Sequence, residues 1–338
     1  INLAADVENQ LLRVVAVSDF AGSTLLRDWE FWQSRLEQLE SPPDPEVLNR
    51  FANELAASEA GIDEVKSQLR RFRHRYMLHV LWREVAGTAE VAETLGALSA
   101  LADRLVAAAG AYAERQLENR CGRFRDREGT IVPLVVLAMG KLGGGELNFS
   151  SDIDIVFLYP ADGESDGPRT LSGQQYFTRL SQSIVSLLDE HTADGFVFRV
   201  DTRLRPFGDS GPPVTSFAAL ESYLLQHGRD WERYAYIKAR IVGQAPPPAV
   251  ADDLFGNLVV PFFYRRYLDY GVFESLREMY ALIAAEVQRR DLADNVKLGP
   301  GGIREIEFIV QSMQLVRGGN REELQQPSLL RVLPALQG

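Results

Sequence analysis

Helical periodicity dominates the first 120 or so residues. One apolar stripe follows Ile62, Val65, Leu69, Phe72, Tyr76 and Val80. Steps of three and four residues place side chains on one face of an α-helix. A second helix, rich in alanine and leucine, is predicted from about 90 to 118, and another follows the proline-punctuated loop SPPDPE at 41–46. These patterns predict a helical N-terminal region.

The pattern changes to short apolar runs after residue 125. Residues 131–138 (IVPLVVLA) predict a buried strand, with Pro133 near its start, where a missing backbone donor is harmless. A glycine-rich turn leads into a second strand at 152–159. A helix at about 174–190 then precedes a third strand at 196–206, FVFRVDTRLRP. These runs predict a small mixed sheet with its own helix.

Helical periodicity returns after QAPPPAV at 244–250, which is typical of a linker. The segment GPGGIREIEFIVQ at 299–311 predicts a further helix that begins behind glycine and proline. The expected fold class is therefore α+β. Three regions are predicted: N-terminal helices at 1–125, a sheet domain at 126–245 and C-terminal helices at 246–338.

Two aspartates stand at the mouth of the second strand. Residues two apart in a strand share a face, so Asp152 and Asp154 point the same way while Ile153 and Ile155 pack the other side. Two carboxylates this close repel each other unless a divalent cation or a proton intervenes. Hard oxygen ligands suit Mg²⁺ or Mn²⁺ rather than zinc, and no neighbouring cysteine or histidine competes.

The third strand carries an acid among arginines. Arg199, Asp201, Arg203 and Arg205 share one face of the predicted strand. Asp201 can complete a metal site with the two earlier acids, and the arginines can contact phosphate oxygens. Three acids from two strands suit two metal ions about 4 Å apart, the arrangement used for in-line displacement at phosphorus. Taken alone, Asp201 is equally explained as a salt-bridge partner of its arginines.

The glycine-rich turn favours a phosphate site. Gly143 and Gly144 allow backbone N–H groups to approach a phosphate closely. Ser151 adds a hydroxyl beside the acids, and Lys141 adds a positive charge at the turn. A glycine run by itself indicates only a turn; the order of turn, strand and facing acids is what indicates phosphate chemistry. The Walker A and dinucleotide-binding patterns are both absent.

Composition narrows the class of function. The net charge of −11 and the pI near 5.0 argue against nucleic-acid binding, which needs a basic surface. The single cysteine, Cys121, excludes an internal disulfide framework and favours the cytoplasm. No apolar run is judged long enough to span a membrane. Because the chain begins at Ile1 rather than methionine, we expect a piece of a longer protein.

Four longer motifs carry a resemblance to a known family. GKLGGGELNFSSDID, VFRVDTRLRPFGDSGP, GRDWERYAYIKARIVG and GGIREIEFIVQ resemble glutamine synthetase adenylyltransferase, a family of bifunctional enzymes that add and remove AMP on glutamine synthetase. The implied fold is the polymerase β-like nucleotidyltransferase palm. The turn departs from that superfamily's usual glycine–serine form, with Lys141 or Gly144 where serine often stands. NFSSDID and GGIREIEF resemble the adenylyl-removing domain, and a second nucleotidyltransferase domain is expected elsewhere in the full-length chain.

The resemblance implies a reaction and a role for each site residue. Inorganic phosphate would attack the AMP phosphorus of adenylyl-tyrosine on glutamine synthetase, giving ADP and the free tyrosine. Asp152 and Asp154 would bind both metal ions, Mg²⁺ or Mn²⁺, and Asp201 the ion that activates the attacking phosphate. The nucleotide phosphates would be gripped by the remaining candidates, Lys141, Gly143, Gly144, Ser151, Arg203 and Arg205. Control by a PII-type signalling protein is also implied.

Two other functions stay open at this stage. One is the opposite activity, adenylyl transfer from ATP, and the other is a catalytically silent module that binds nucleotide or a signalling protein. A template-independent nucleic-acid polymerase is a third, disfavoured by the acidic charge.

Several further charged residues have two interpretations each. Lys238 and Arg240 are candidates for the cleft, whereas Trp231 and Tyr234 are interpreted as core residues. The acids and Arg304 at the start of the last predicted helix either border the site or simply complement the helix dipole. The run RRFRHR at 70–75 is interpreted as the solvated side of the long helix.

Overall fold

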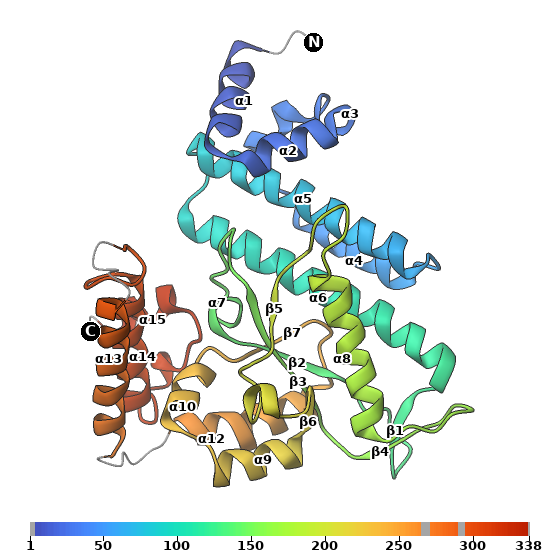
Figure 1. Cartoon of the computed structure of the whole chain (residues 1–338), viewed down its shortest axis with the longest axis vertical. Coiled ribbons are helices and arrows are strands. Elements are labelled where there is room, and N and C mark those ends of the chain that lie inside the picture. The colour runs from blue at the N-terminus through green and yellow to red at the C-terminus, as the bar shows by residue number, and fades with distance from the viewer. Residues whose placement is uncertain (1–3, 265–270, 290–294, 337–338) are drawn as a thin grey trace.

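The N-terminal third of the protein is helical in the computed structural model, which describes residues 4–264, 271–289 and 295–336 (Figure 1). Its elements are α1 (Ala5–Val17), α2 (Asp19–Arg27), α3 (Trp29–Trp32), the 3-10 helix η1 (Leu36–Glu40), α4 (Pro45–Ala57), α5 (Ile62–Ala86) and α6 (Val91–Cys121). The three helices predicted here are confirmed as α4, α5 and α6. The Asp44 side chain accepts from the Glu46 backbone N–H, and Pro45 occupies the first turn, so α4 begins where the loop ends.

A separate small core joins the first helices to α5. Trp32 and Leu36 pack with Leu78 and Trp82, which lie in the second half of α5. Figure 1 shows α1 to α3 above α5, on the side away from the sheet. These first helices therefore do not reach the sheet, and α5 connects the two cores.

The sheet at the centre has five short strands in mixed orientation. They are β2 (Val135–Ala138), β3 (Ile153–Tyr159), β5 (Val200–Asp201), β6 (Val214–Ser216) and β7 (Arg240–Val242). Strand β2 is antiparallel to β3 and β7, while β5 and β6 both run parallel to β3, one beside each end of it. A separate two-stranded sheet pairs β1 (Phe124–Asp126) with β4 (Gly163–Ser165). The predicted α+β class is confirmed.

Two of the predicted strands are shorter than expected. Pairing in the first begins only at Val135, two residues after Pro133. The third is a strand only at Val200–Asp201, so its extension to residue 206 is wrong. The Asp201 carboxylate accepts a hydrogen bond from the Arg203 backbone N–H at 2.8 Å, and this local bond turns the chain out of the sheet.

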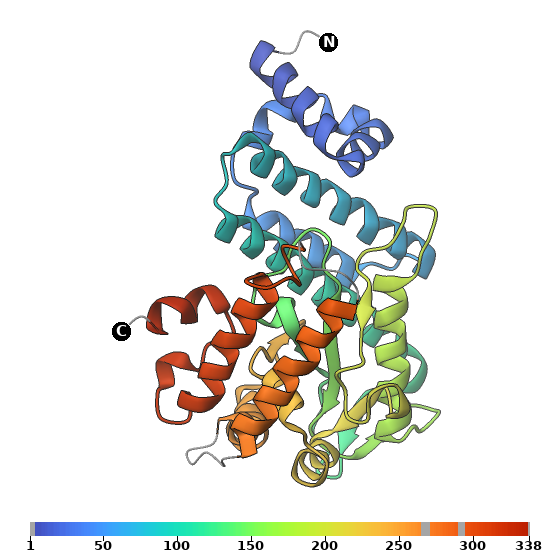
Figure 2. The ribbon, with the colours of Figure 1, turned by 60° about the vertical axis from the view of Figure 1, so that its left-hand side comes forward.

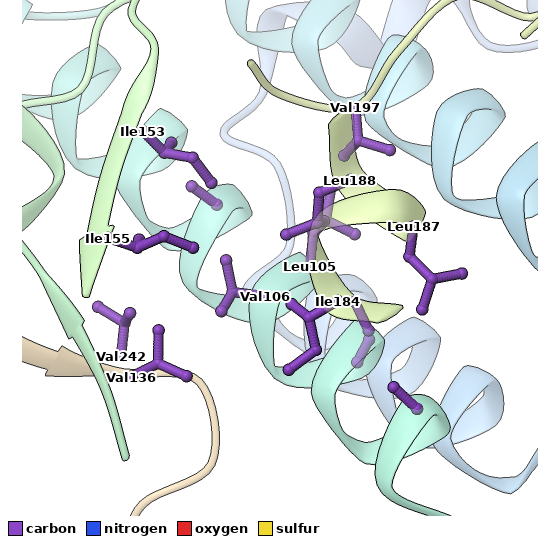
Figure 3. Packing of buried hydrophobic residues seen from close by; sticks show 14 of the residues in the cluster. Leu105, Val106, Val136, Ile153, Ile155, Ile184, Leu187, Leu188, Val197 and Val242 are labelled. Atoms are coloured by element: carbon purple, nitrogen blue, oxygen red, sulfur yellow. The ribbon is translucent and has the colours of Figure 1, made fainter. Parts of the chain in front are cut away.

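Each face of the sheet is covered by a different set of helices. The middle and end of the sheet region contain α7 (Gly140–Gly143), α8 (Gly173–Asp189), the 3-10 helix η2 (Gly208–Ser210), α9 (Phe217–Gln226) and α10 (Asp230–Tyr236). Ile153 and Ile155 of β3 point toward Val106 of α6 and Ile184 of α8 (Figure 3). Val156, the next residue after Ile155, belongs to the core on the opposite face.

The C-terminal helices cover that opposite face. They are α11 (Pro248–Asp252), the π-helix η3 (Asp253–Val259), α12 (Val260–Phe263), α13 (Gly271–Arg289), α14 (Ile303–Arg317), the 3-10 helix η4 (Glu322–Leu324) and α15 (Leu329–Leu336). Phe262 of α12 and Phe308 of α14 share a core with Val156 and Leu158 of β3. Figure 2 shows the C-terminal helices standing in front of the sheet. The sheet thus shares cores with helices from both ends of the chain, and the three-region division stays a prediction.

Helix α6 corrects one expectation. By length and composition it is apolar enough to cross a membrane, although no run was judged long enough from the sequence. Half of its most apolar stretch is buried within the structure, and Leu105, Val106 and Ala109 lie in the main core. A buried core helix meets the same criterion, and that is how this fold uses α6.

Candidate active site

Three aspartates lie together at the start of β3. Strand β5 pairs with β3 so that Asp154 and Asp201 are register partners. Side chains of register partners lie on the same face of a sheet, and Asp152, two residues earlier, shares that face. The short strand β5 therefore brings Asp201 to the other two acids. All three face the side of the sheet covered by α10 and α14.

The central acid is held in an unfavourable electrostatic environment. Burial, followed by the charges of Asp201 and Asp152, raises the pKa of Asp154 to about 6. A hydrogen bond from Arg203 lowers the pKa of Asp201 below its usual range. A divalent cation between the carboxylates would remove the repulsion at Asp154.

Arginines hold the two outer acids. Arg199 Nε donates to Asp152 Oδ1 at 2.5 Å, and Arg203 Nε donates to both Asp201 oxygens at 2.9 and 3.0 Å. Both arginine side chains are mostly exposed, at 62% and 70%. With these side-chain positions, no group of three or more His, Cys, Asp or Glu in the described parts of the chain is arranged to hold a metal ion.

A glycine leaves room beside the central acid. Gly140 has φ +54°, and a Cβ there would lie 2.5 Å from Asp154 Oδ2. Any larger residue would clash with this carboxylate and would be strained in its backbone. Three hard carboxylate donors beside a glycine cradle fit Mg²⁺ or Mn²⁺ by their chemistry. Sequence reasoning missed Gly140; its place directly after β2 and Met139 was the available signal.

The acids open into the main cavity of the site, of about 660 Å³. Its lining includes Asp152 and Asp154, together with Ser151 and Gly140. The other walls come from α10, from the turn at 297–298 and from α14. Asp201 lies beside a second cavity of about 340 Å³, which it shares with Asp152 and Arg203. The acid cluster therefore stands between two openings.

The structure divides the glycine-turn candidates. Lys141 lines the cavity, and Ser151 lines it while its hydroxyl donates to Asn148 Oδ1 at 2.6 Å. Gly143 and Gly144 do not line it: Gly143 is packed against the backbone of Lys238, and Gly144 faces the carbonyl of Pro327. The glycines at these two positions serve close packing in this structure.

Gly143→Ala is expected to destabilise the fold by about 2 kcal/mol or more, because overpacking against rigid backbone is costly. The added Cβ would lie 1.8 Å from the carbonyl oxygen of Lys238. Gly96→Ala is the control, because Gly96 is exposed on α6 and a Cβ there would meet no atom within 4 Å. Thermal unfolding measures both variants. Equal midpoints would contradict the packing role of Gly143.

The two arginine candidates end in different places. Arg203 stays beside Asp201 at the second cavity. Arg205 turns away: it donates to the carbonyl and hydroxyl of Thr202 and lines a third cavity with Ser181. The shared face predicted for both arginines is wrong because the strand ends at Asp201.

Residues from the C-terminal half complete the cavity wall. Lys238 is buried there and pairs with Glu307 at 3.0 Å and with Glu146 at 3.7 Å. Glu146 in turn accepts hydrogen bonds from the Ser328 hydroxyl and the Leu330 backbone N–H, which anchors the start of α15 to the glycine-rich turn.

The remaining candidates are split by the structure. Arg304 lines the cavity, so the helix behind GPGG does border the site, whereas Glu305 accepts from the Tyr280 hydroxyl instead. Arg240 lies outside, paired with Asp103 at 2.8 Å. Trp231 is 41% exposed, so its core interpretation is wrong. Tyr234 packs against the core beside Phe308 and also lines the cavity.

Comparison with known proteins agrees with these motifs. The family model described as Glutamate-ammonia ligase adenylyltransferase matches residues 8–253, and the model described as GlnD PII-uridylyltransferase matches residues 277–338. Curated relatives from Shewanella oneidensis, Shewanella frigidimarina and Shewanella loihica are 46%, 47% and 46% identical over 99% of this chain. Each is named "Bifunctional glutamine synthetase adenylyltransferase/adenylyl-removing enzyme", and this chain spans 35% of its length.

The first of these matches covers well over half of the chain, including the whole sheet and all three aspartates. The chain belongs to the glutamate-ammonia ligase adenylyltransferase family.

Proposed function

We propose that this chain is the adenylyl-removing domain of a bifunctional family member. It would deadenylylate glutamine synthetase by phosphorolysis of adenylyl-tyrosine. The observation that carries the proposal is the in-register pairing of Asp154 with Asp201, beside Asp152, at the mouth of a cavity. The motifs NFSSDID and GGIREIEF favour removal over transfer, because they resemble the adenylyl-removing domain.

The reaction joins two anions, so charge neutralisation and alignment are its main requirements. An oxygen of inorganic phosphate forms a bond to the AMP phosphorus, and the bond from that phosphorus to the tyrosine oxygen breaks. The tyrosine oxygen leaves with the electron pair and takes up a proton, while AMP and phosphate depart together as ADP. Mg²⁺ or Mn²⁺ held by Asp152, Asp154 and Asp201 would supply the positive charge that this displacement needs. Arg199 and Arg203 would move aside from Asp152 and Asp201.

The partners proposed with this function follow from the family. Adenylylated glutamine synthetase is the substrate, and a second nucleotidyltransferase domain of the full-length protein performs the opposite reaction. The similarity of residues 277–338 to a PII-uridylyltransferase supports regulation in a PII context. The site would act in the cytoplasm, without nucleic acid or membrane.

Product analysis tests the proposal. Incubated with adenylylated glutamine synthetase, phosphate and Mg²⁺ or Mn²⁺, the chain is expected to release ADP and unmodified glutamine synthetase. Removing the divalent ion with a chelator should stop ADP release, and resupplying it should restore the rate. Consumption of ATP with attachment of AMP would assign the chain to the transferring activity instead. Absence of both reactions would favour a silent regulatory module.

A further inference from the structure

The main cavity is positively charged although the chain is acidic. The chain has 47 acidic and 36 basic residues, yet five cationic and three anionic side chains line this cavity, a net charge of +2. Two of these cations are paired within the cavity wall, Arg199 with Asp152 and Lys238 with Glu307. The excess positive charge of the cavity therefore comes from the three other cations, Lys141, Lys297 and Arg304.

These three cations come from distant segments and line the same cavity. Lys141 is on α7, Lys297 is in the turn that precedes α14, and Arg304 is in the first turn of α14. None of the three side chains has a hydrogen bond or ion pair within the described ranges. Burial and then the charge of Lys297 lower the pKa of Lys141. Like charges facing one cavity are unfavourable unless an anion joins them.

We infer that Lys141, Lys297 and Arg304 form the binding site for the attacking inorganic phosphate, which becomes the terminal phosphate of the ADP product. This inference rests on the proposed function and deepens it. The residues that line the cavity then have two different tasks. The aspartates would hold the AMP phosphorus through divalent ions, and the three cations would hold the second phosphate.

The chemistry of the ligand follows from the cluster. A phosphate ion at neutral pH carries between one and two negative charges and several acceptor oxygens, which suits three separate donors. Because the phosphate keeps its place when it bonds to the AMP phosphorus, one set of cations would serve inorganic phosphate and the outer phosphate of ADP. AMP lacks that outer phosphate and would not use the cluster.

Ligand binding to this 338-residue chain tests the inference without relying on turnover. The double variant Lys297→Gln/Arg304→Gln removes two exposed side chains, so the fold should be retained. Charge-assisted hydrogen bonds are worth about 10- to 100-fold in affinity each. We expect the affinities for inorganic phosphate and for ADP, measured by calorimetry with Mg²⁺, to fall at least about tenfold. The affinity for AMP should change by less than about twofold, since AMP has no outer phosphate for these cations to bind.

Arg331→Gln is the matched control, because Arg331 is also an exposed helical arginine but lies on α15 outside the cavity. It should change none of the three affinities. Unchanged ADP affinity in the double variant, or equal losses for ADP and AMP, would overturn the inference.

Steady-state kinetics separate this inference from the proposed function. If ADP is produced, the double variant should have a raised KM for phosphate and an unchanged KM for adenylylated glutamine synthetase. A raised KM for the protein substrate alone would count against the phosphate site. If the wild-type chain shows no phosphorolysis, the proposed function fails, whereas the difference between ADP and AMP binding still decides whether the cluster holds an outer phosphate.

Discussion

Asp154→Asn is expected to lower the rate of deadenylylation by at least about a thousandfold, because it removes the central charge of the acid cluster. Asp154 is the register partner of Asp201 and is two residues from Asp152, so it is the acid that both others depend on to complete a shared site. Asparagine has nearly the same size but offers a neutral ligand. The measurement is the rate of ADP release from adenylylated glutamine synthetase at saturating phosphate and Mg²⁺.

The same variant should fold at least as well as the wild type when divalent ions are removed. The pKa of Asp154 in the folded protein, about 6, lies above its usual value of 3.8, so the folded state disfavours the charged form. Stability of the cation-free protein is therefore lost as the pH rises through that interval. Asparagine carries no such penalty. Thermal unfolding in chelator at pH 8 should show a midpoint no lower than that of the wild type.

Asp162→Asn provides the comparison, because Asp162 is an exposed aspartate just beyond the opposite end of β3. Its turnover should stay within about twofold of the wild type, since surface substitutions away from a site have small effects. A folded Asp154→Asn protein that retains the wild-type rate would show that the reaction does not depend on this cluster. The silent-module alternative or another site would then be favoured.

The convergence of the acids could be anticipated from strand alternation, but its details could not. Period two places Asp152 and Asp154 on one face whatever the rest of the fold does. The same rule failed for Arg203 and Arg205, because the Asp201 side chain bonds to the Arg203 backbone and ends the strand. A local hydrogen bond of this kind competes with the backbone hydrogen bonds between strands. The alternation of apolar and polar residues does not predict it.

Tertiary contacts determine which of the glycines and cations lie at the cavity. A run of glycines does not say which of them faces a ligand; Gly140 lies against Asp154, whereas Gly143 lies against the backbone of Lys238. The cations Lys297 and Arg304 are more than 140 residues from Asp154 in sequence and reach the cavity only because α14 packs across the sheet. Spacing within a motif cannot report such a contact.

The basic run at 70–75 shows the same limit most clearly. The interpretation as a solvated helix face holds for the exposed Arg71 but is wrong for Arg70, which is fully buried, and for Arg73, which is 9% exposed. Arg70 donates to the carbonyls of Lys66 at 2.8 Å, Gly195 at 2.7 Å and Leu187 at 3.1 Å, and also to Glu190. Three of these carbonyls belong to the end of α8 and to the loop that leads into β5. The guanidinium of Arg70, on α5, thus donates hydrogen bonds to backbone carbonyl groups at the C-terminal end of α8 that would otherwise lack a partner.

Arg70→Met is therefore expected to destabilise the protein by about 3–5 kcal/mol, because several buried carbonyl groups lose their hydrogen-bond donor. Methionine retains most of the aliphatic stem, so the loss reports the hydrogen bonds rather than a cavity. Arg71→Met is the control: its side chain is exposed one position along the same helix, and it should cost less than about 0.5 kcal/mol. Urea unfolding curves give both free energies.

The hydrogen bonds of Arg70 also bear on the active site, because the loop that they hold leads into β5. The loop that Arg70 holds at Gly195 continues to Asp201, and Ser67 of the same helix donates to Asp194 at 2.7 Å. If these contacts fix the register of β5, Arg70→Met should also reduce turnover under conditions where most of the protein is still folded. If the free energy of unfolding of this variant falls by less than about 1 kcal/mol, water or other donors satisfy the carbonyl groups, since buried acceptors without a donor cost more than that. The helix would then not be what places Asp201 beside Asp154.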